Sequence, residues 1–213
     1  MKPNSVMIVD DDDLVRVGLR AVLSGLSRYE VVGEASNGRE AAKLARKLEP
    51  DIIIIDVGMA EMNGIDATKR ILSTNPSTKI IAVSMHTESR YVTQMLDAGA
   101  IGYLPKQRAI DELPFALKTI QAGQVYLSPS VAGAVLTQIR DGNTSPADIL
   151  SVREREVLQS IAEGKSASQI SKNLHLSVKT IESHRRNIMN KLELYSVAEL
   201  TKFALKEGIT SFD

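Results

Sequence analysis

The strongest constraint on the fold is a pattern that occurs five times: a short run rich in β-branched residues precedes a stretch with helical apolar spacing. The runs are VMIV (6–9), YEVVGEA (29–35), DIIIID (51–56), KIIAVSM (79–85) and IGYLPK (101–106). The helical stretches are Leu14–Leu26, Arg39–Leu48, Ile65–Leu72, Tyr91–Ala98 and Ile110–Ala122. Strands and helices that alternate in this way form a parallel sheet with helices on both faces. The pattern therefore predicts a five-stranded, doubly wound α/β domain.

The alternation ends after Gly123, where the sequence changes character. The segment SPSVAGAVLTQIR (128–140) has room for one short helix, and DGNTSPAD (141–148) is polar and rich in turn-forming residues. We interpret residues 126–148 as a linker. It would separate a first domain, residues 1–125, from a second domain, residues 149–213.

The second domain is predicted to be all-α, with four helices over roughly 152–163, 167–174, 178–192 and 197–206. Three of these helices begin with a serine that is followed three residues later by Glu or Gln, the pattern of a capping box. The pairs are Ser151 with Glu154, Ser166 with Gln169, and Ser196 with Glu199. Ser177 is a fourth N-cap candidate. These positions give a consistent set of helix starts.

Reactive side chains follow four of the five predicted strands. Asp10 and Asp11 follow the first, Asp56 ends the third, Ser84 ends the fourth and Lys106 ends the fifth. Parallel strands bring their carboxyl ends to one edge of the sheet, which is where such sheets bind ligands. Carboxylates with water are the ligands that Mg²⁺ prefers. We expect Asp56 to attack a phosphoryl group as a nucleophile, with Lys106 and Ser84 contacting the resulting phosphate.

Each of these residues also has an ordinary interpretation. An aspartate run after a strand is often a solvated turn, and we expect Asp12 or Asp13 to cap the first helix. Ser84 alone would be a polar strand end, and Lys106 alone a surface lysine. The specific feature is the order of acid pair, aspartate, serine and lysine at the ends of successive strands.

Composition excludes several other classes of protein. The sequence has no cysteine, so disulfides, thiolate catalysis and cysteine metal sites are absent. The formal net charge is zero, so any attraction to nucleic acid must be local. No apolar run approaches about 18 residues, and the N-terminus lacks a signal-peptide core. We therefore expect no membrane partner and a cytoplasmic location.

A local basic surface is predicted on the third helix of the second domain. The segment ASQISKNLHLSVKTIESHRRNIMNKL reads as helix, turn, helix, with Val178, Ile181, Ile188 and Leu192 facing inward. From Ser177 to Leu192, four basic residues stand against one acid. This balance is typical of phosphate contact in nucleic-acid binding, although it also fits a solvated helix face. The candidates for reading bases are Lys179, Thr180 and Ser183, and those for contacting phosphates are Arg186, Asn187 and Lys191.

The segments IVDD, DIIIID with MNG, VSMH and GYLPK resemble a response-regulator receiver domain over about residues 5–122. The resemblance implies a flavodoxin-like fold and phosphorylation of Asp56 by a sensor histidine kinase or a small phosphodonor. It also implies Mg²⁺ bound by Asp11 and Asp56, with Asp10 acting through water and the Gly58 carbonyl as a further ligand. Tyr103 would be the aromatic switch. Three positions depart from the usual receiver pattern, namely Gly58, Ala60 and Gln107.

The segment from Leu150 to Ile209 is similar to the LuxR-type DNA-binding domain, through LSVREREVL, the AEGK turn and SVKTIESHRRNIMNKL. Together the two resemblances indicate a NarL/FixJ-type response regulator, whose phosphorylation controls binding to double-stranded DNA and transcription. Such a protein is not an enzyme, and it is expected to be a homodimer when phosphorylated or DNA-bound. The final helix would then supply a dimerisation surface of Val197, Leu200, Thr201, Ala204 and Leu205, positions that otherwise read as plain core.

Two rival interpretations stay open. Phosphatases with an aspartate nucleophile also combine strand-end Asp, Ser, Lys and Mg²⁺. They resemble a D-x-D pattern, however, whereas position 58 is Gly, and no insertion is long enough to form a substrate cap. The other rival is a regulator that binds DNA without phosphorylation, or a protein–protein scaffold.

Overall fold

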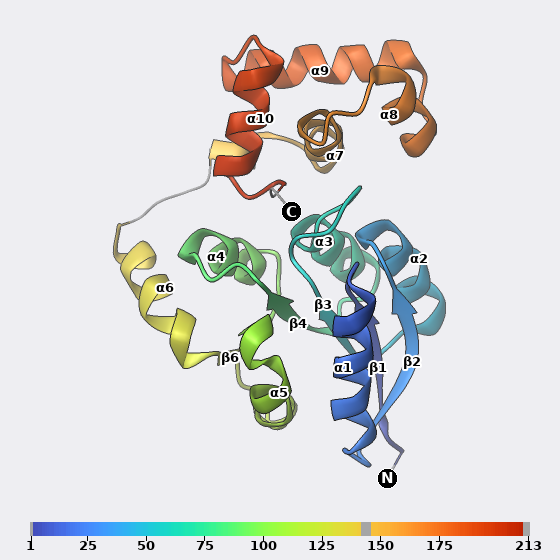
Figure 1. Ribbon diagram of the computed structural model, residues 1–213, viewed down its shortest axis with the longest axis vertical. Helices are drawn as coiled ribbons and strands as arrows, with labels where there is room; N and C mark the ends of the chain where they lie inside the picture. The colour runs from blue at the N-terminus through green and yellow to red at the C-terminus, as the bar shows by residue number, and fades with distance from the viewer. Residues whose placement is uncertain (1, 142–145, 211–213) are drawn as a thin grey trace. The chain divides into compact units, whose positions relative to one another are not determined.

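The computed structural model of the chain describes residues 2–141 and 146–210. The chain divides into two compact units, Met1–Asp141 and Gly142–Asp213 (Figure 1). No helix among the described residues is long and apolar enough to cross a membrane.

The first unit is built on a parallel sheet of six strands in the order β2-β1-β3-β4-β5-β6. The strands are β1 Asn4–Val9, β2 Tyr29–Ala35, β3 Ile52–Ile55, β4 Lys79–Ser84, β5 Gly102–Pro105 and β6 Tyr126–Leu127. Val9 pairs with Ile55, and Ile55 pairs with Ala82, so the central strands end level with one another. The five predicted strands are therefore present, and they share the expected edge.

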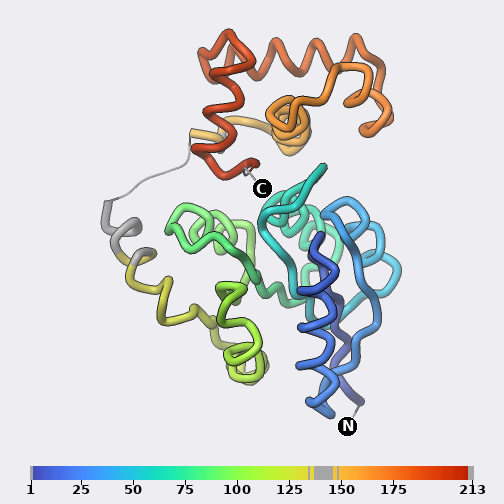
Figure 2. Tube along the Cα trace, viewed as in Figure 1, coloured from blue at the N-terminus to red at the C-terminus, as the bar shows by residue number. Residues whose placement is uncertain are grey.

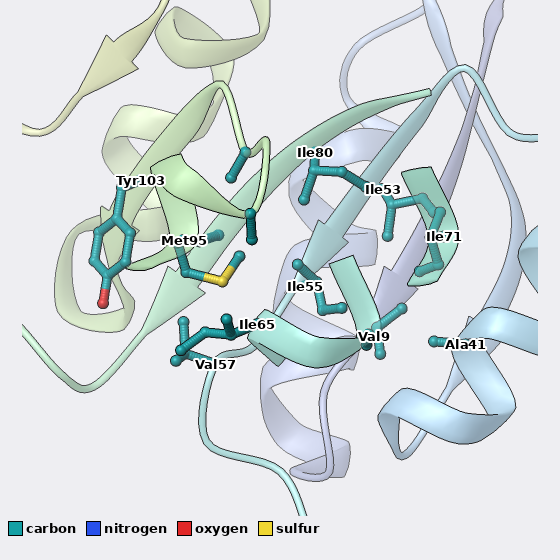
Figure 3. Close-up of a cluster of buried hydrophobic side chains, with 14 of the residues drawn as sticks. Val9, Ala41, Ile53, Ile55, Val57, Ile65, Ile71, Ile80, Met95 and Tyr103 are labelled. Atoms are coloured by element: carbon teal, nitrogen blue, oxygen red, sulfur yellow. The ribbon is translucent and has the colours of Figure 1, made fainter. Parts of the chain in front are cut away.

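Helices cover both faces of this sheet (Figure 1). They are α1 Asp13–Ser24, α2 Gly38–Leu48, α3 Gly64–Thr74, α4 Ser89–Asp97, α5 Lys106–Gln121 and α6 Pro129–Asp141. Asp12 caps α1 through a hydrogen bond from the Leu14 N–H, as predicted for Asp12 or Asp13. In β3, Ile53 and Ile55 pack with residues of α2, α3 and α4, as Figure 3 shows. Ile52 and Ile54 pack with α1 and α5 on the other face.

The strand β6 and the helix α6 correct the expected boundary of the first unit. Strand β6 extends the sheet by pairing Gly102 with Tyr126 and Tyr103 with Leu127. Helix α6 buries Val131 and Val135 in the core cluster that also contains α4 residues. Residues 126–141 therefore belong to the first unit and not to a linker. A strand of two residues is too short for an alternation of apolar and polar side chains to be recognised in the sequence.

The second unit consists of helices alone in its described part. They are the 3₁₀ helix η1 Pro146–Ile149, α7 Val152–Ala162, α8 Ala167–Leu174, α9 Val178–Leu192 and α10 Val197–Lys206. All three predicted capping boxes form, and Ser177 caps α9. The turn from α8 to α9, traced in Figure 2, passes through His175 in the left-handed region at φ 53°. His175 thus adopts the conformation that glycine often provides at a helix end.

The core of the second unit joins all four of its α-helices. Its buried side chains include Leu158, Ile170, Ile181 and Leu200. Val178, which was expected to face inward, is instead 46% exposed. It is the first residue of α9, so no earlier turn of that helix covers it.

Candidate functional site

The carboxylates of Asp10, Asp11 and Asp56 meet at the carboxyl edge of the sheet, as predicted. Asp10 follows β1 and Asp56 follows β3, and these strands are neighbours, so the Asp56 N–H donates to the Val9 carbonyl at 2.8 Å. One oxygen from each of the three carboxylates lies within 4.8 Å of the others. Asp10 and Asp56 are buried, whereas Asp11 is exposed. Three oxygens at this spacing form a site that could hold one metal ion.

Lys106 joins this group from the carboxyl end of β5. It is the first residue of α5, and its Nζ lies 2.8 Å from Asp56 Oδ2 and 2.9 Å from both carboxylate oxygens of Asp10. Burial alone would lower the pKa of Lys106, but the adjacent Asp56 and Asp10 carboxylates outweigh burial and raise it. The lysine is therefore a fixed cation between two buried acids.

Buried negative charge in the pocket perturbs Asp10. Burial, and then the charge of Asp56, raise the pKa of Asp10 to about 6. Asp10 Oδ2 is buried, and although Lys106 Nζ lies 2.9 Å from it, the hydrogen bond of that ammonium group goes to Oδ1. Lys106 contacts two of the three carboxylates, and the set of three carboxylate oxygens fits a hard divalent cation.

Asp56 is held rigidly by its own loop. Its Oδ1 accepts hydrogen bonds from the backbone N–H groups of Val57 at 2.6 Å and Gly58 at 3.3 Å. A Cβ atom at Gly64 would lie 2.0 Å from the Asp56 carbonyl oxygen, so α3 can begin there only with glycine. Asp56 is 5% exposed, so its carboxylate is enclosed and has little freedom to move. The Gly58 carbonyl as a metal ligand stays a prediction.

Ser84 and Tyr103 are linked through the backbone of one residue, His86. The Ser84 hydroxyl accepts from the His86 N–H at 3.1 Å, and the Tyr103 hydroxyl donates to the His86 carbonyl at 2.6 Å. Both side chains are fully buried, and Figure 3 shows Tyr103 beside Met95 in the core cluster. Burial raises the pKa of Tyr103 well above its ordinary value. Any displacement of the β4–α4 loop would therefore change the hydrogen bond that Tyr103 makes.

Two contributors to this site were not predicted from sequence. His86 was quoted only as part of VSMH, although its backbone connects Ser84 to Tyr103. Arg16, on α1, donates to the Asp10 carbonyl oxygen at 2.6 Å and pairs with Glu34 at 3.5 Å. Its spacing from Asp10 carries no recognisable signal, because the contact depends on how α1 folds back over β1.

The predicted DNA-contact residues of α9 lie mostly on its exposed face. Lys179, Ser183, Arg186 and Asn187 are exposed, and Thr180 is half-buried with its hydroxyl 2.8 Å from that of Ser177. These residues recur at the spacing of one helical face, which the structure leaves open.

Lys191 differs from the other predicted DNA-contact residues. Its Nζ lies 2.7 Å from Glu154 Oε2, on the first turn of α7, and donates to the Ile149 carbonyl at 3.4 Å. Glu154 is buried. Lys191 is thus engaged within the second unit.

The predicted dimerisation residues of α10 fall into two groups. Leu200 and Ala204 are fully buried in the core of the second unit, so they cannot form part of an exposed surface. Val197 is 42% exposed, and Thr201 and Leu205 are partly exposed. Leu200 and Ala204 are therefore not dimerisation residues. The second unit is small, so its core includes the inward-facing residues of α10.

Comparisons with known proteins cover nearly the whole chain. Residues 6–118 match the family described as response regulator receiver domain, and residues 148–204 match bacterial regulatory proteins of the luxR family. The chain is 37% identical over 206 residues to the response regulator GacA of Pseudomonas viridiflava, which covers 96% of each chain. It is 36% identical to the response regulator UvrY of Escherichia coli K12, over 96% of this chain and 95% of UvrY.

Solved structures give the same result. The chain resembles RcsB from Salmonella enterica serovar Typhimurium, bound to a promoter in the presence of the phosphomimetic BeF₃⁻. The TM-score is 0.63 and the sequence identity 31%, over 98% of this chain and 100% of that chain. A second match, a complex of the two-component response regulator RcsB with DNA, has a TM-score of 0.61 and 30% identity over 97% and 99% of the two chains.

Proposed function

Because the chain belongs to the NarL/FixJ family of response regulators, with a receiver domain joined to a LuxR-type DNA-binding domain, we propose that phosphorylation of Asp56 controls its binding to DNA. The observation that carries this proposal is the meeting of Asp56 with Asp10, Asp11 and Lys106 at one edge of the sheet. The kinase that supplies the phosphoryl group would be a sensor histidine kinase. We propose a cytoplasmic location, since the proposed target is DNA.

The proposed reaction is the transfer of one phosphoryl group. A carboxylate oxygen of Asp56 forms a bond to phosphorus, and the bond between phosphorus and the donor's histidine nitrogen, or a small donor's oxygen, breaks with its electron pair leaving on the donor. Mg²⁺ held by Asp11, Asp56 and the Gly58 carbonyl, with Asp10 acting through water, would neutralise the phosphoryl oxygens. Asp56 Oδ2 now pairs with Lys106, so this lysine is placed to pair with the new phosphate instead.

The same event can be transmitted through the β4–α4 loop. A phosphate on Asp56 adds roughly 1.5 to 2 negative charges and new hydrogen-bond acceptors. If the Ser84 hydroxyl donates to this phosphate, its contact with the His86 N–H changes. The contact between Tyr103 and the His86 carbonyl then changes as well. The β4–α4 loop would thus have two arrangements, and phosphorylation of Asp56 would favour one of them.

In the second domain, we propose that α9 is the DNA-recognition helix. Its exposed face would read bases through Lys179, Thr180 and Ser183 and contact phosphates through Arg186 and Asn187. One of the similar solved structures consists of two RcsB dimers bound to two parallel DNAs. We propose a homodimer here too, with Val197 and Thr201 of α10 at its interface, since both are accessible.

The test is a genome-wide map of DNA occupancy with and without a small phosphodonor and Mg²⁺. The wild-type chain should gain occupancy at paired half-sites with the donor, and Asp56→Asn should not. In parallel, wild type should form an acyl phosphate with labelled donor, and Asp56→Asn should remain unlabelled. Equal occupancy in all conditions would favour a regulator that acts without phosphorylation, and label on Asp56→Asn would move the nucleophile elsewhere.

A phosphatase with the same pocket is the rival class. We propose a regulator and not a phosphatase. In the D-x-D pattern of such phosphatases the second acid would stand at position 58, which is Gly in this chain. No second carboxylate at that position can protonate a leaving group. Multiple turnover of a phosphomonoester by the pure protein, lost in Asp56→Asn, would reverse this choice.

A further inference from the structure

We propose that Lys191 is a positioning residue, which fastens the end of the recognition helix α9 to the start of α7, and that it is not a contact to DNA phosphate. This inference rests on the proposed function of α9. It deepens that function by assigning to Glu154 and Lys191 the task of setting the orientation of the helix.

The first argument is the geometry around Glu154. A single carboxylate oxygen, Oε2, accepts from the Ser151 N–H at 2.8 Å, the Ser151 hydroxyl at 2.9 Å and Lys191 Nζ at 2.7 Å. The side chain of Glu154 is 6% exposed. The capping box of α7 and the ammonium group of α9 therefore share one acceptor.

The second argument is what Lys191 would give up by turning to DNA. Its side chain is 42% exposed, yet its ammonium group is held by Glu154 and by the Ile149 carbonyl. A move toward a phosphate would leave the Glu154 carboxylate buried without its cation, which is strongly unfavourable. Arg186 and Asn187 are exposed on the same helix and can reach a phosphate without such a loss.

The third argument is the position of the contact along α9. Lys191 lies in the last turn of the helix, and the base-reading candidate Lys179 lies in the first. With a rise of about 1.5 Å per residue, about 18 Å separate them. A small tilt at the fastened end therefore displaces Lys179 from its base. The Ile149 carbonyl, also contacted by Lys191, brings the last residue of η1 into the same junction.

The experiment compares Lys191→Met and Glu154→Gln with wild type, using a duplex that the wild-type chain selects from a random-sequence pool. Kd is measured across a range of about 50 to 200 mM salt. Both variants should lose about tenfold in affinity with an unchanged salt slope, because the same helix orientation is lost. A phosphate contact gives a different result: Lys191→Met lowers the slope by about 0.9, as Arg186→Met should. Glu154→Gln then binds as well as wild type or better, because the ammonium group is freed.

Two matched variants separate positioning from general stability. Ser151→Ala removes a cap donor but leaves the Glu154–Lys191 pair, so it should lower the thermal midpoint and keep wild-type affinity. Lys191→Arg should restore most of the affinity that Lys191→Met loses. All titrations are made below each variant's thermal midpoint. Loss of affinity in Ser151→Ala equal to that in Glu154→Gln would overturn the inference. A wild-type chain that selects no duplex would overturn the proposed function as well.

Discussion

At the scale of single residues, the receiver site depends on the rigid placement of one carboxylate. The backbone N–H groups of Val57 and Gly58 hold one oxygen of Asp56, and Lys106 holds the other. The missing side chain of Gly64 lets α3 begin against the Asp56 carbonyl. The nucleophile thus has a fixed position before any phosphodonor arrives, which favours in-line transfer.

Gly64→Ala should destabilise the receiver unit. The new Cβ atom would lie 2.0 Å from the Asp56 carbonyl oxygen, so the loop must shift. Overpacking of this kind costs typically about 1–3 kcal/mol in unfolding free energy, measured by urea titration. The matched control is Gly18→Ala, where a Cβ meets nothing within 4 Å on α1. That variant should gain roughly 0.5–1 kcal/mol. Equal stability of both variants would contradict the steric argument.

Lys179→Ala should lose about 1–3 kcal/mol of binding free energy at the selected duplex and accept more sequences at one base position. The reason is that an exposed side chain on the first turn of a recognition helix reaches base edges. Arg186→Ala should instead weaken binding to all duplexes alike. The measurement is a titration against the selected duplex and single-base variants of it. An unchanged base preference in Lys179→Ala would exclude a base-reading role.

At the scale of elements, helix starts in the second unit are determined by short-range chemistry. The side chains of Ser151, Ser166 and Ser196 each accept from the N–H three residues later, and each serine donates its own N–H to the Glu or Gln side chain there. These pairs satisfy donors that the first turn of a helix leaves open. The box at α7 has an added partner, because Glu154 also binds Lys191 of α9. A local cap thereby becomes a contact between two helices.

The Glu154 contact makes the stability of the second unit depend on pH. Burial alone would raise the pKa of Glu154, but hydrogen bonds from Lys191 and Ser151 outweigh it and hold the pKa below its ordinary value of 4.5. The folded state thus favours the charged form. The stabilisation is present above pH 4.5 and is lost as the pH falls through the lowered pKa.

The check is the thermal midpoint of wild type and Glu154→Gln between pH 7 and pH 3. Wild type should be the more stable at neutral pH, and the difference should shrink below pH 4.5. A difference that stays constant with pH would show that the carboxylate charge is not the source.

At the scale of the whole molecule, the chain consists of two units whose boundary lies later than composition indicates. Strand β6 and helix α6 complete the receiver unit. The Ser128 N–H also donates to the Tyr103 carbonyl at 3.0 Å. The segment that leads out of the receiver unit is therefore attached to the strand that carries the proposed switch residue.

A fragment of residues 1–141 should be more stable than a fragment of residues 1–125. The shorter fragment loses Val131 and Val135, both buried in the core. Burying one valine side chain contributes about 1.5 kcal/mol or more, so the difference should be at least about 3 kcal/mol. Urea unfolding of the two fragments measures it. Equal unfolding free energies would mean that α6 adds nothing to the receiver core.

The sequence by itself determined the features that depend on neighbours along the chain. Periods of two and of about 3.6 residues predicted five strands and nearly all the helices, and capping serines predicted where helices begin. The strand-end residues Asp10, Asp56 and Lys106 were also predicted to meet, because parallel strands share an edge. The structure confirmed each of these expectations.

Only the tertiary structure decided the features that depend on partners far along the chain. Glu154 and Lys191 are 37 residues apart, and neither carries a signal for the other. The burial of Leu200 and Ala204, and the link from Ser84 through His86 to Tyr103, likewise follow from packing. The physical reason is that a charged or apolar side chain has the same local pattern whether it faces solvent, a partner protein or its own core. Its actual partner is selected by the fold.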